Sequence, residues 1–319
     1  MELFRVIKPG LFTTVQDLGR WGYQRLGVPV SGVMDEYAFA AANLLVENQL
    51  NDASLEVTLI GPELEGLRKA QIAVTGADFS LAVNGDLVSM WQTINIERGD
   101  TFTFAGGARS GCRAYLAVKG GIDVPLVLGS RSTYVRGGFG GNEGRALRTG
   151  DLIRVFASEK SLKSKRTLPP ELVPCYDKEF SVDVVLGPQE DMFTAEGVET
   201  FLSSPYTVTP ESDRMGYRLS GNPIERKSTA EPVTEALVKG SAQVPSNGQP
   251  IILMADAQTS GGYPKIATVC TPGASRLAQA KPSDKVHFHK ISLSEAHRQY
   301  IEYEKRLHKL GNQLVREAI

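Results

Sequence analysis

The chain of 319 residues is long enough for two domains, each with its own hydrophobic core. Hydrophobic residues make up 41% and charged residues 22%, as in ordinary globular proteins, and the net charge of −1 gives no basic surface for nucleic acid or an anionic membrane. No apolar run approaches the length of a transmembrane span. All 4 histidines lie after residue 286, which excludes a Ser-His-Asp triad from the earlier regions.

The stretch from Thr13 to Asp35 is rich in glycine and polar residues and has few periodic apolar positions. We therefore expect a long polar loop, held by a scaffold, rather than an ordinary helix or strand. A helical pattern begins at Asp35, which can serve as the N-cap, and Asn48 is a plausible C-cap.

Short apolar runs separated by glycine turns follow this helix. Their spacing of roughly 8–12 residues predicts a β-sandwich or β-barrel. After a first strand at residues 4–7, the runs are 55–60, 71–75, 79–83, 93–96, 101–104 and 112–118, with Asn84-Gly85 as a hairpin turn.

A second glycine-rich stretch, residues 128–151, contains Arg131, Arg136, Arg145 and Arg148. Arginines beside flexible backbone amides could bind a carboxylate or a phosphate. A glycine-rich loop with surface arginines explains the same composition. The stretch has no Walker motif.

The charged, proline-bearing residues 158–180 have the composition of a linker. They would separate a first domain, residues 1–157, from a second β-rich domain, residues 181–291. Residues 292–319 form the last region, in which apolar residues recur at helical spacing from residue 296 to residue 314 and predict an amphipathic helix over 294–318.

The two halves share three short motifs in the same order, which favours duplicated β domains. Residues 20–26 resemble 214–219, residues 72–77 resemble 252–257, and residues 99–104 resemble 283–288. In a duplicated protein we expect the site in the groove between the halves.

Six stretches of the sequence carry a family resemblance: GLFTTVQDLGRWGYQRLGVPVSGVMD, LEVTLIGPEL, YLAVKGGIDVPLVLGSRSTY, GGNEGRALRTGD, ESDRMGYRL and MADAQTSGGYPKIA. Through them the chain resembles the family of KipA and the 5-oxoprolinase C subunit, which is related to the second allophanate-hydrolase-type module and to the carboxyltransferase domain of urea carboxylase. The resemblance spans roughly residues 8 to 290 and implies two tandem cyclophilin-like β-barrel domains, so that the fold is mainly β with a few helices. One departure is Ala257, where the family pattern has arginine.

The resemblance implies a cytoplasmic protein that works in a complex with two others, a KipI-like B subunit of 5-oxoprolinase together with its A subunit. That complex uses ATP, with Mg²⁺, to open the lactam of 5-oxo-L-proline to L-glutamate, and ATP would bind either this chain or a partner. Two alternatives stay open: a regulatory protein that sequesters a KipI-like kinase inhibitor, and a carboxyltransferase-type module of a biotin-dependent enzyme.

Opening a lactam with ATP requires cations for phosphate, carboxylates for Mg²⁺ or for orienting the nucleophile, and polar groups for the amide. The polar stretches supply these types. Asp35 is better explained as a helix cap, and the alternative for Arg20 and Arg214 is simple pairing with Asp17 and Asp213 across a turn. The catalytic candidates are Asp17, Asp213, Asp256 and Lys265, and the substrate- or nucleotide-binding candidates are Thr14, Gln16, Arg20, Ser31, Arg131, Arg145, Arg214, Gln258 and Thr259.

Overall fold

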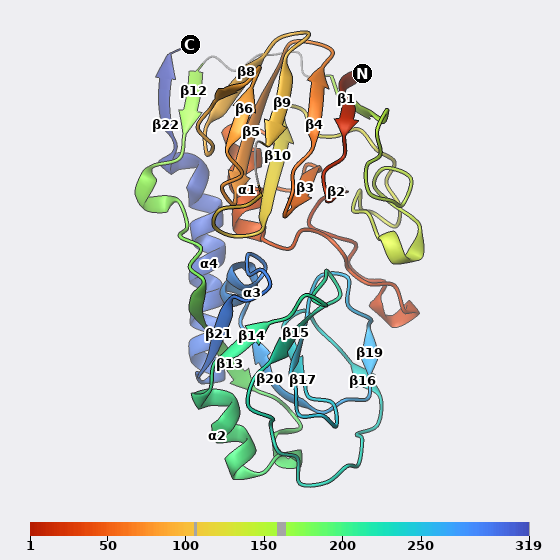
Figure 1. The fold of residues 1–319 in the computed structure, drawn as a ribbon, viewed down its shortest axis with the longest axis vertical. Helices are drawn as coiled ribbons and strands as arrows, with labels where there is room; N and C mark the ends of the chain where they lie inside the picture. Colours follow the sequence, from red (N-terminus) through yellow and green to blue (C-terminus); the bar gives the residue numbers. More distant parts are fainter. Residues whose placement is uncertain (105–106, 158–163, 319) are drawn as a thin grey trace. The chain divides into compact units, whose positions relative to one another are not determined.

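The computed structural model describes residues 1–104, 107–157 and 164–318, and the chain divides into two compact units (Figure 1). The first unit comprises Met1–Arg20, Ser31–Cys175 and Arg306–Ile319, and the second comprises Trp21–Val30 and Tyr176–Lys305. Each unit is therefore assembled from segments that are separated in sequence. Within the described ranges, no helix has the length and apolar character that crossing a membrane requires.

The first unit contains two antiparallel sheets. One has the strand order β11-β1-β4-β9-β6-β7 and the other β2-β3-β10-β5-β8. The strands of the first sheet are β1 (Glu2–Lys8), β4 (Glu63–Gly66), β6 (Leu81–Val83), β7 (Asp86–Leu87), β9 (Thr101–Phe104) and β11 (Leu152–Arg154); those of the second are β2 (Phe12–Gln16), β3 (Ser54–Thr58), β5 (Ala70–Gly76), β8 (Thr93–Ile96) and β10 (Arg113–Val118).

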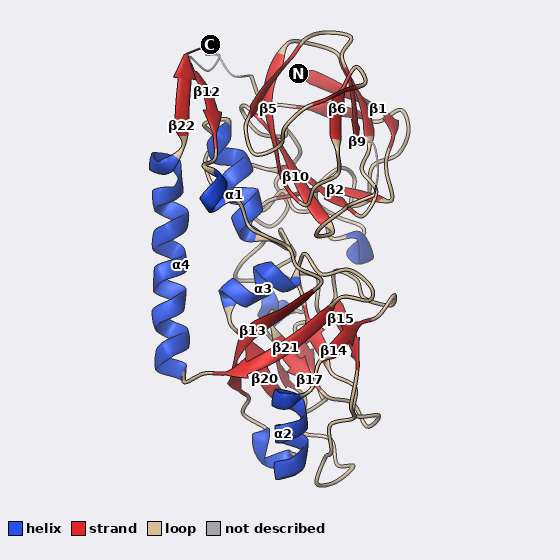
Figure 2. Cartoon of the chain, turned by 60° about the vertical axis from the view of Figure 1, so that its left-hand side comes forward, coloured by secondary structure: helices blue, strands red, loops and turns tan. Residues whose placement is uncertain are grey.

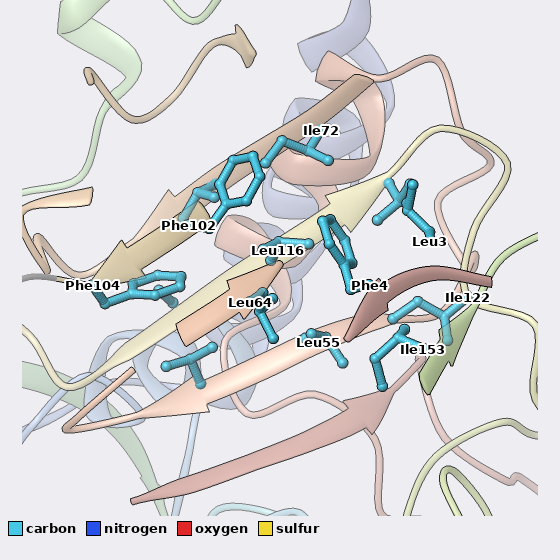
Figure 3. Packing of buried hydrophobic residues seen from close by; sticks show 14 of the residues in the cluster. Leu3, Phe4, Leu55, Leu64, Ile72, Phe102, Phe104, Leu116, Ile122 and Ile153 are labelled. Atoms are coloured by element: carbon cyan, nitrogen blue, oxygen red, sulfur yellow. The ribbon is translucent and has the colours of Figure 1, made fainter. Parts of the chain in front are cut away.

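The two sheets enclose one hydrophobic core, seen in Figure 3. The rings of Phe4 on β1 and Phe102 on β9 meet edge to face with their centroids 5.8 Å apart. Leu64 and Leu116 are fully buried members of the same core. Apolar side chains from both sheets therefore bury each other, which is the main stabilisation available to a sandwich of this kind.

Helix α1 (Glu36–Leu45) contacts β5 and β10 and buries the outer face of the second sheet (Figure 2). Asp35 is its N-cap, as predicted, because its side chain accepts hydrogen bonds from the backbone N–H groups of Tyr37 and Ala38. The predicted C-cap at Asn48 is wrong. The helix ends at Leu45, and the Asn48 amide instead donates to the Val118 carbonyl at 2.8 Å.

The second unit is a closed barrel with the strand order β13-β20-β17-β18-β15-β14-β21. Strands β13 and β21 pair in parallel, and the ring of Phe288 on β21 stacks on Phe201 of the adjoining helix at 4.4 Å. The strands are β13 (Glu179–Leu186), β14 (Tyr206–Val208), β15 (Gly216–Ser220), β17 (Ser241–Gln243), β18 (Ile251–Leu253), β20 (Lys265–Val269) and β21 (Lys285–Lys290), and the helices are α2 (Ala195–Ser203) and α3 (Thr271–Leu277).

Shorter elements complete the chain. Strands β16 (Glu235–Ala236) and β19 (Ser260–Gly261) pair with each other in the second unit. Single 3-10 turns lie at Gln24–Leu26, Val135–Gly137, Pro170–Leu172 and Glu190–Met192.

The structure confirms the prediction of a mainly β chain with a barrel and a C-terminal helix, α4 (Leu293–Gln313). Two sequence-based details were wrong. Residues Phe12–Gln16 form strand β2, although the stretch was expected to be a loop, because β2 pairs with β3 along its whole length. The helix also stops before residue 318, and β22 (Val315–Ala318) pairs with β12 (Ser164–Thr167).

Two of the three short motifs that the halves share include strand residues in both units. Residues 72–77 and 252–257 include parts of β5 and β18, and residues 99–104 and 283–288 include parts of β9 and β21. The third motif, residues 20–26 and 214–219, lies outside any strand in its first copy and includes the start of β15 in its second.

Candidate functional site

In the first unit, the carboxylate of Asp17 joins two loops. Its Oδ1 accepts hydrogen bonds from Ser130 Oγ at 2.6 Å, Ser132 Oγ at 2.5 Å and the Gly19 N–H at 2.8 Å. Its Oδ2 accepts from the Arg131 N–H at 2.6 Å. Asp17 is buried, so these four donors use the acceptor capacity that a general base or metal ligand would need. Its position indicates an anchor for the site loops.

Arg20 is fully buried beside this anchor. Its Nη2 donates to the carbonyl of Ser132, and its guanidinium lies 4.9 Å from the centre of the Phe139 ring. The expected pairing with Asp17 is absent from the described contacts of that carboxylate. Gly140 permits this arrangement, because a β carbon there would come within 2.1 Å of the Ser132 oxygen.

Thr14, Gln16 and Ser31 are all buried residues of the first unit. Gln16 Nε2 donates to Thr14 Oγ1 at 3.0 Å and to the Thr133 carbonyl at 3.2 Å, which fixes the orientation of the amide. Gln16 Oε1 and Ser31 Oγ are both buried and have no hydrogen-bond partner among the described residues.

Ser31 also has a φ of 56°, a conformation that non-glycine residues adopt at a cost. The next residue, Gly32, packs so closely on the turn after Asp17 that a β carbon would lie 2.8 Å from the Gly19 nitrogen. A hydrogen bond of 2.9 Å from the Val33 N–H to the Asp17 carbonyl joins the segment after Gly32 to the turn after Asp17. The fold therefore holds Ser31 in a strained position with an unsatisfied hydroxyl.

A cavity of about 730 Å³ is lined in part by residues that contact Arg20, but Thr14, Gln16, Asp17 and Ser31 are not among its lining residues. Phe139, whose ring contacts Arg20, forms part of its wall together with Gly140 and Gly141. Arg131 also lines the cavity. Its Nε donates a hydrogen bond to the Val124 carbonyl at 3.1 Å, and its guanidinium carbon lies 5.0 Å from the centre of the Phe156 ring. The glycine-rich loop thus borders this cavity.

Arg145 is engaged in a bidentate ion pair with Asp151, with contacts of 2.7 and 3.0 Å. The hydrogen bond to Asp151 raises the pKa of Arg145. Burial alone would raise the pKa of Asp151, but the hydrogen bonds from Arg145 and from the Arg148 N–H lower it below its usual range. The ion pair therefore stabilises the loop that contains both residues.

In the second unit, Arg214 pairs with Asp256, which corrects the expected pairing with Asp213. Its Nε lies 2.8 Å from Oδ2 and its Nη2 lies 3.0 Å from Oδ1, and both residues are buried. Asp213 instead accepts from the backbone N–H groups of Met215 and Gly216 at 2.8 and 3.1 Å. It is a turn residue next to the ion pair.

Lys265, at the start of β20, lies near the opposite end of β18 from Asp256. It is opposite Gln243 on β17, which in turn is opposite Ile251 at the start of β18, whereas Asp256 follows the end of β18. Lys265 Nζ contacts Glu235 Oε2 at 2.8 Å. The predicted site residues of the second unit therefore separate into two groups.

Gln258 is exposed, and the Thr259 carbonyl accepts a hydrogen bond from the Leu237 N–H at 2.9 Å.

The sequence-based prediction missed two pairs of polar residues. Ser130 and Ser132 flank Arg131 in a stretch that had been singled out, whereas Gln189 and Glu235 lie in no unusual motif. Across the described ranges, no three His, Cys, Asp or Glu side chains lie close enough together to hold a metal ion.

Comparison with known proteins agrees with this fold. The family model described as "Carboxyltransferase domain, subdomain A and B" matches residues 26–290. The C subunit of 5-oxoprolinase from Escherichia coli (strain K12) is 37% identical over 294 residues, which cover 92% of this chain and 93% of that protein.

Larger proteins contain a similar segment. The urea amidolyase of Saccharomyces cerevisiae is 35% identical over 300 residues, which are 89% of this chain but only 16% of that protein. The crystal structure of Kluyveromyces lactis urea carboxylase matches 100% of this chain and 31% of that one, with 30% identity and a TM-score of 0.91. The chain therefore belongs to the carboxyltransferase subdomain A and B family, whose members include the C subunit of 5-oxoprolinase.

Proposed function

We propose that this chain is the C subunit of an ATP-dependent 5-oxoprolinase, which opens 5-oxo-L-proline to L-glutamate and acts as a complex. The support from the comparisons is that the E. coli protein of this name matches over 93% of its own length. The observation in the structure that carries the proposal is that two polar atoms of the first unit, Gln16 Oε1 and Ser31 Oγ, are buried and have no hydrogen-bond partner among the described residues.

Buried polar atoms without partners cost free energy, and those that persist call for an explanation such as a ligand. A lactam presents an N–H donor, a carbonyl acceptor and, in 5-oxo-L-proline, a carboxylate. The Gln16 amide donates both of its hydrogens within the chain, and its Oε1 is an acceptor without a partner among the described residues, which suits the lactam N–H. The Ser31 hydroxyl can donate to the lactam oxygen, the atom that ATP would activate.

We further propose that ATP and Mg²⁺ bind a partner in the cytoplasm, either the KipI-like B subunit or the A subunit of the complex. Three of the candidate arginines do not fit a phosphate site, because Arg145 is paired with Asp151, Arg214 with Asp256, and Arg131 contacts Val124 and Phe156. In this division of labour the chain binds and orients the lactam and excludes water from it until it is activated.

The test is glutamate release by the complex reconstituted from this chain and its partners, measured with ATP and 5-oxo-L-proline. Gln16→Met removes the acceptor at similar volume, and we expect it to raise KM by about tenfold, the loss of one buried hydrogen bond. Gln92→Met is the matched control, because Gln92 is a partly exposed amide that donates only to the Ser89 carbonyl among the described contacts. Unchanged kinetics in Gln16→Met would remove this site from the proposal.

Two outcomes favour the alternatives. A complex without turnover, in which this chain still binds its KipI-like sister protein, supports the regulatory function. Carboxyl transfer from a carboxylated biotin carrier, in place of glutamate release, supports the carboxyltransferase function, which the family model and the urea carboxylase match favour.

A further inference from the structure

In the second unit, a buried cation is paired with an exposed anion. The side chain of Lys265, on β20, is 9% exposed, whereas that of Glu235 is 49% exposed. Their Nζ–Oε2 distance is 2.8 Å, and this hydrogen bond lowers the pKa of Glu235. A buried ammonium needs a counter-charge, but nothing requires that counter-charge to come from the chain itself. Because Glu235 is half in water, an external anion can compete for its place.

A second donor meets the same carboxylate oxygen. Gln189 Nε2 lies 2.8 Å from Glu235 Oε2, and Gln189 Oε1 accepts from the Lys265 N–H at 3.2 Å, which fixes the amide so that its donor faces outward. Gln189 is itself buried. A buried ammonium and a buried, oriented amide thus converge on one point, the arrangement that recognises a carboxylate.

Glu235 belongs to a strap, residues 231–238, that is weakly held. Its strand β16 pairs with β19 over two residues, a pairing too short to be stable alone. Val233 and Val238 on the strap are 85% and 56% exposed, and Leu237 is its buried anchor. Removal of Glu235 from the pair with Lys265 therefore requires only a local rearrangement.

The strap also lies over a third polar group. Gly261 is the cross-strand partner of Glu235, and a β carbon on Gly261 would come within 3.1 Å of Gln243 Nε2. No side chain at position 261 therefore separates Gln243 from the strap. Gln243 is opposite Lys265 in the sheet register, so a ligand that displaced Glu235 would have this amide beside it.

We infer that Lys265 and Gln189 form a binding site for the carboxylate of a small-molecule ligand, and that Glu235 occupies this site as an internal carboxylate until the ligand displaces it. The residues of this site belong to the second unit and Gln16 to the first, and the inference does not rest on the proposed function. The substrate and the product of that function, 5-oxo-L-proline and L-glutamate, both belong to the ligand class.

The experiment measures binding to the full chain by isothermal titration calorimetry. The probes are 5-oxo-L-proline, L-glutamate and 2-pyrrolidinone, which is the same lactam ring without the carboxylate. Glu235→Gln removes the competing anion, and we expect it to bind at least one of the two carboxylates about tenfold more tightly than the unmodified chain does, without any gain for 2-pyrrolidinone. The preferred carboxylate identifies substrate or product as the ligand.

Two further variants sharpen the result. In Gln189→Glu the acceptor for the Lys265 N–H is kept and the outward donor is lost, so carboxylate affinity should fall about tenfold. Glu231→Gln is the matched control on the same strap, because Glu231 pairs with Arg226 at 3.0 Å, and its affinities should equal those of the unmodified chain.

The inference is overturned if Glu235→Gln binds neither carboxylate more tightly, or if its affinity for 2-pyrrolidinone rises equally. Turnover by the reconstituted complex is measured separately. A complex that turns over normally while these titrations fail refutes this site and leaves the proposed function intact.

Discussion

Arg214 and Asp256 hold each other through both their side chains and their backbones. The two side-chain contacts measure 2.8 and 3.0 Å, and the Asp256 N–H donates to the Arg214 carbonyl at 2.8 Å. The pair joins the segment before β15 to the turn after β18, two strands that are neighbours in the barrel. Removing either residue therefore tests stability before it tests catalysis.

We expect Arg214→Met to lower the free energy of unfolding by about 3–5 kcal/mol, because Asp256 would be left as an unpaired buried charge. Urea denaturation followed by circular dichroism measures it. Replacing both residues, as Arg214→Met with Asp256→Leu, should restore most of the loss, and Arg218→Met on the exposed face of β15 should change little. A double variant as unstable as the single one would contradict this account.

Asp17→Asn should destabilise the first unit by about 2–3 kcal/mol. An amide has only one acceptor oxygen, so its NH₂ group would face one of the donors that Asp17 now accepts from, and hydrogen bonds to a charged group are each worth about 1.5–3 kcal/mol. Thermal unfolding checks this, with Asp86→Asn in the exposed hairpin as the control. Equal melting temperatures in the two variants would show that Asp17 does not anchor the loops.

Two glycines of the 138–144 loop separate backbone strain from steric overlap. Both have positive φ, 68° at Gly138 and 74° at Gly140, but a β carbon on Gly138 meets nothing within 4 Å. We expect Gly138→Ala to cost about 1 kcal/mol from strain. Gly140→Ala should cost a further 1–3 kcal/mol or so from overlap with Ser132 and Arg20. Equal losses in chemical denaturation would mean that the loop adjusts freely.

Ser31→Gly should separate stability from activity. Glycine adopts a φ of 56° without strain and has no buried hydroxyl, so the chain should gain about 0.5–1 kcal/mol in unfolding free energy. If the hydroxyl contacts the lactam, the complex should lose turnover at the same time. Ser31→Ala removes the hydroxyl but keeps the strain, and should lose turnover with a smaller gain in unfolding free energy than Ser31→Gly. A fully active Ser31→Gly complex would exclude the hydroxyl from the reaction.

The lowered pKa of Asp151 predicts how the stability of the first unit changes as the pH falls. Burial opposes ionisation of this carboxyl, but the hydrogen bonds from Arg145 and Arg148 prevail and lower its pKa in the folded state. Its stabilising contribution is therefore present above the ordinary carboxyl pKa and is lost as the pH falls through the lowered value. Asp151→Asn should be less stable at neutral pH and should lose less on acidification. Parallel pH profiles of unfolding free energy for the two proteins would contradict this.

The sequence predicted the local features and missed those that depend on long-range pairing. Asp35 was identified as a cap because its hydrogen bonds lie within three residues. For Arg214 the sequence offered a binding role or, as the alternative, pairing with its neighbour Asp213, whereas its partner is 42 residues away, which no local pattern indicates. Strand β2 was missed for the same reason, because its polar residues become a strand only through pairing with β3.

The interleaving of the two units bears on how the chain folds during synthesis. The first unit includes residues from 1 onward, yet it also includes Arg306–Ile319, and β12 finds its partner only when β22 has been made. A ribosome therefore begins the first unit early and supplies its last strand after the whole barrel of the second unit has emerged. The sandwich of the first unit, whose core residues all lie before residue 156, can therefore form early, whereas the β12-β22 pair must form last.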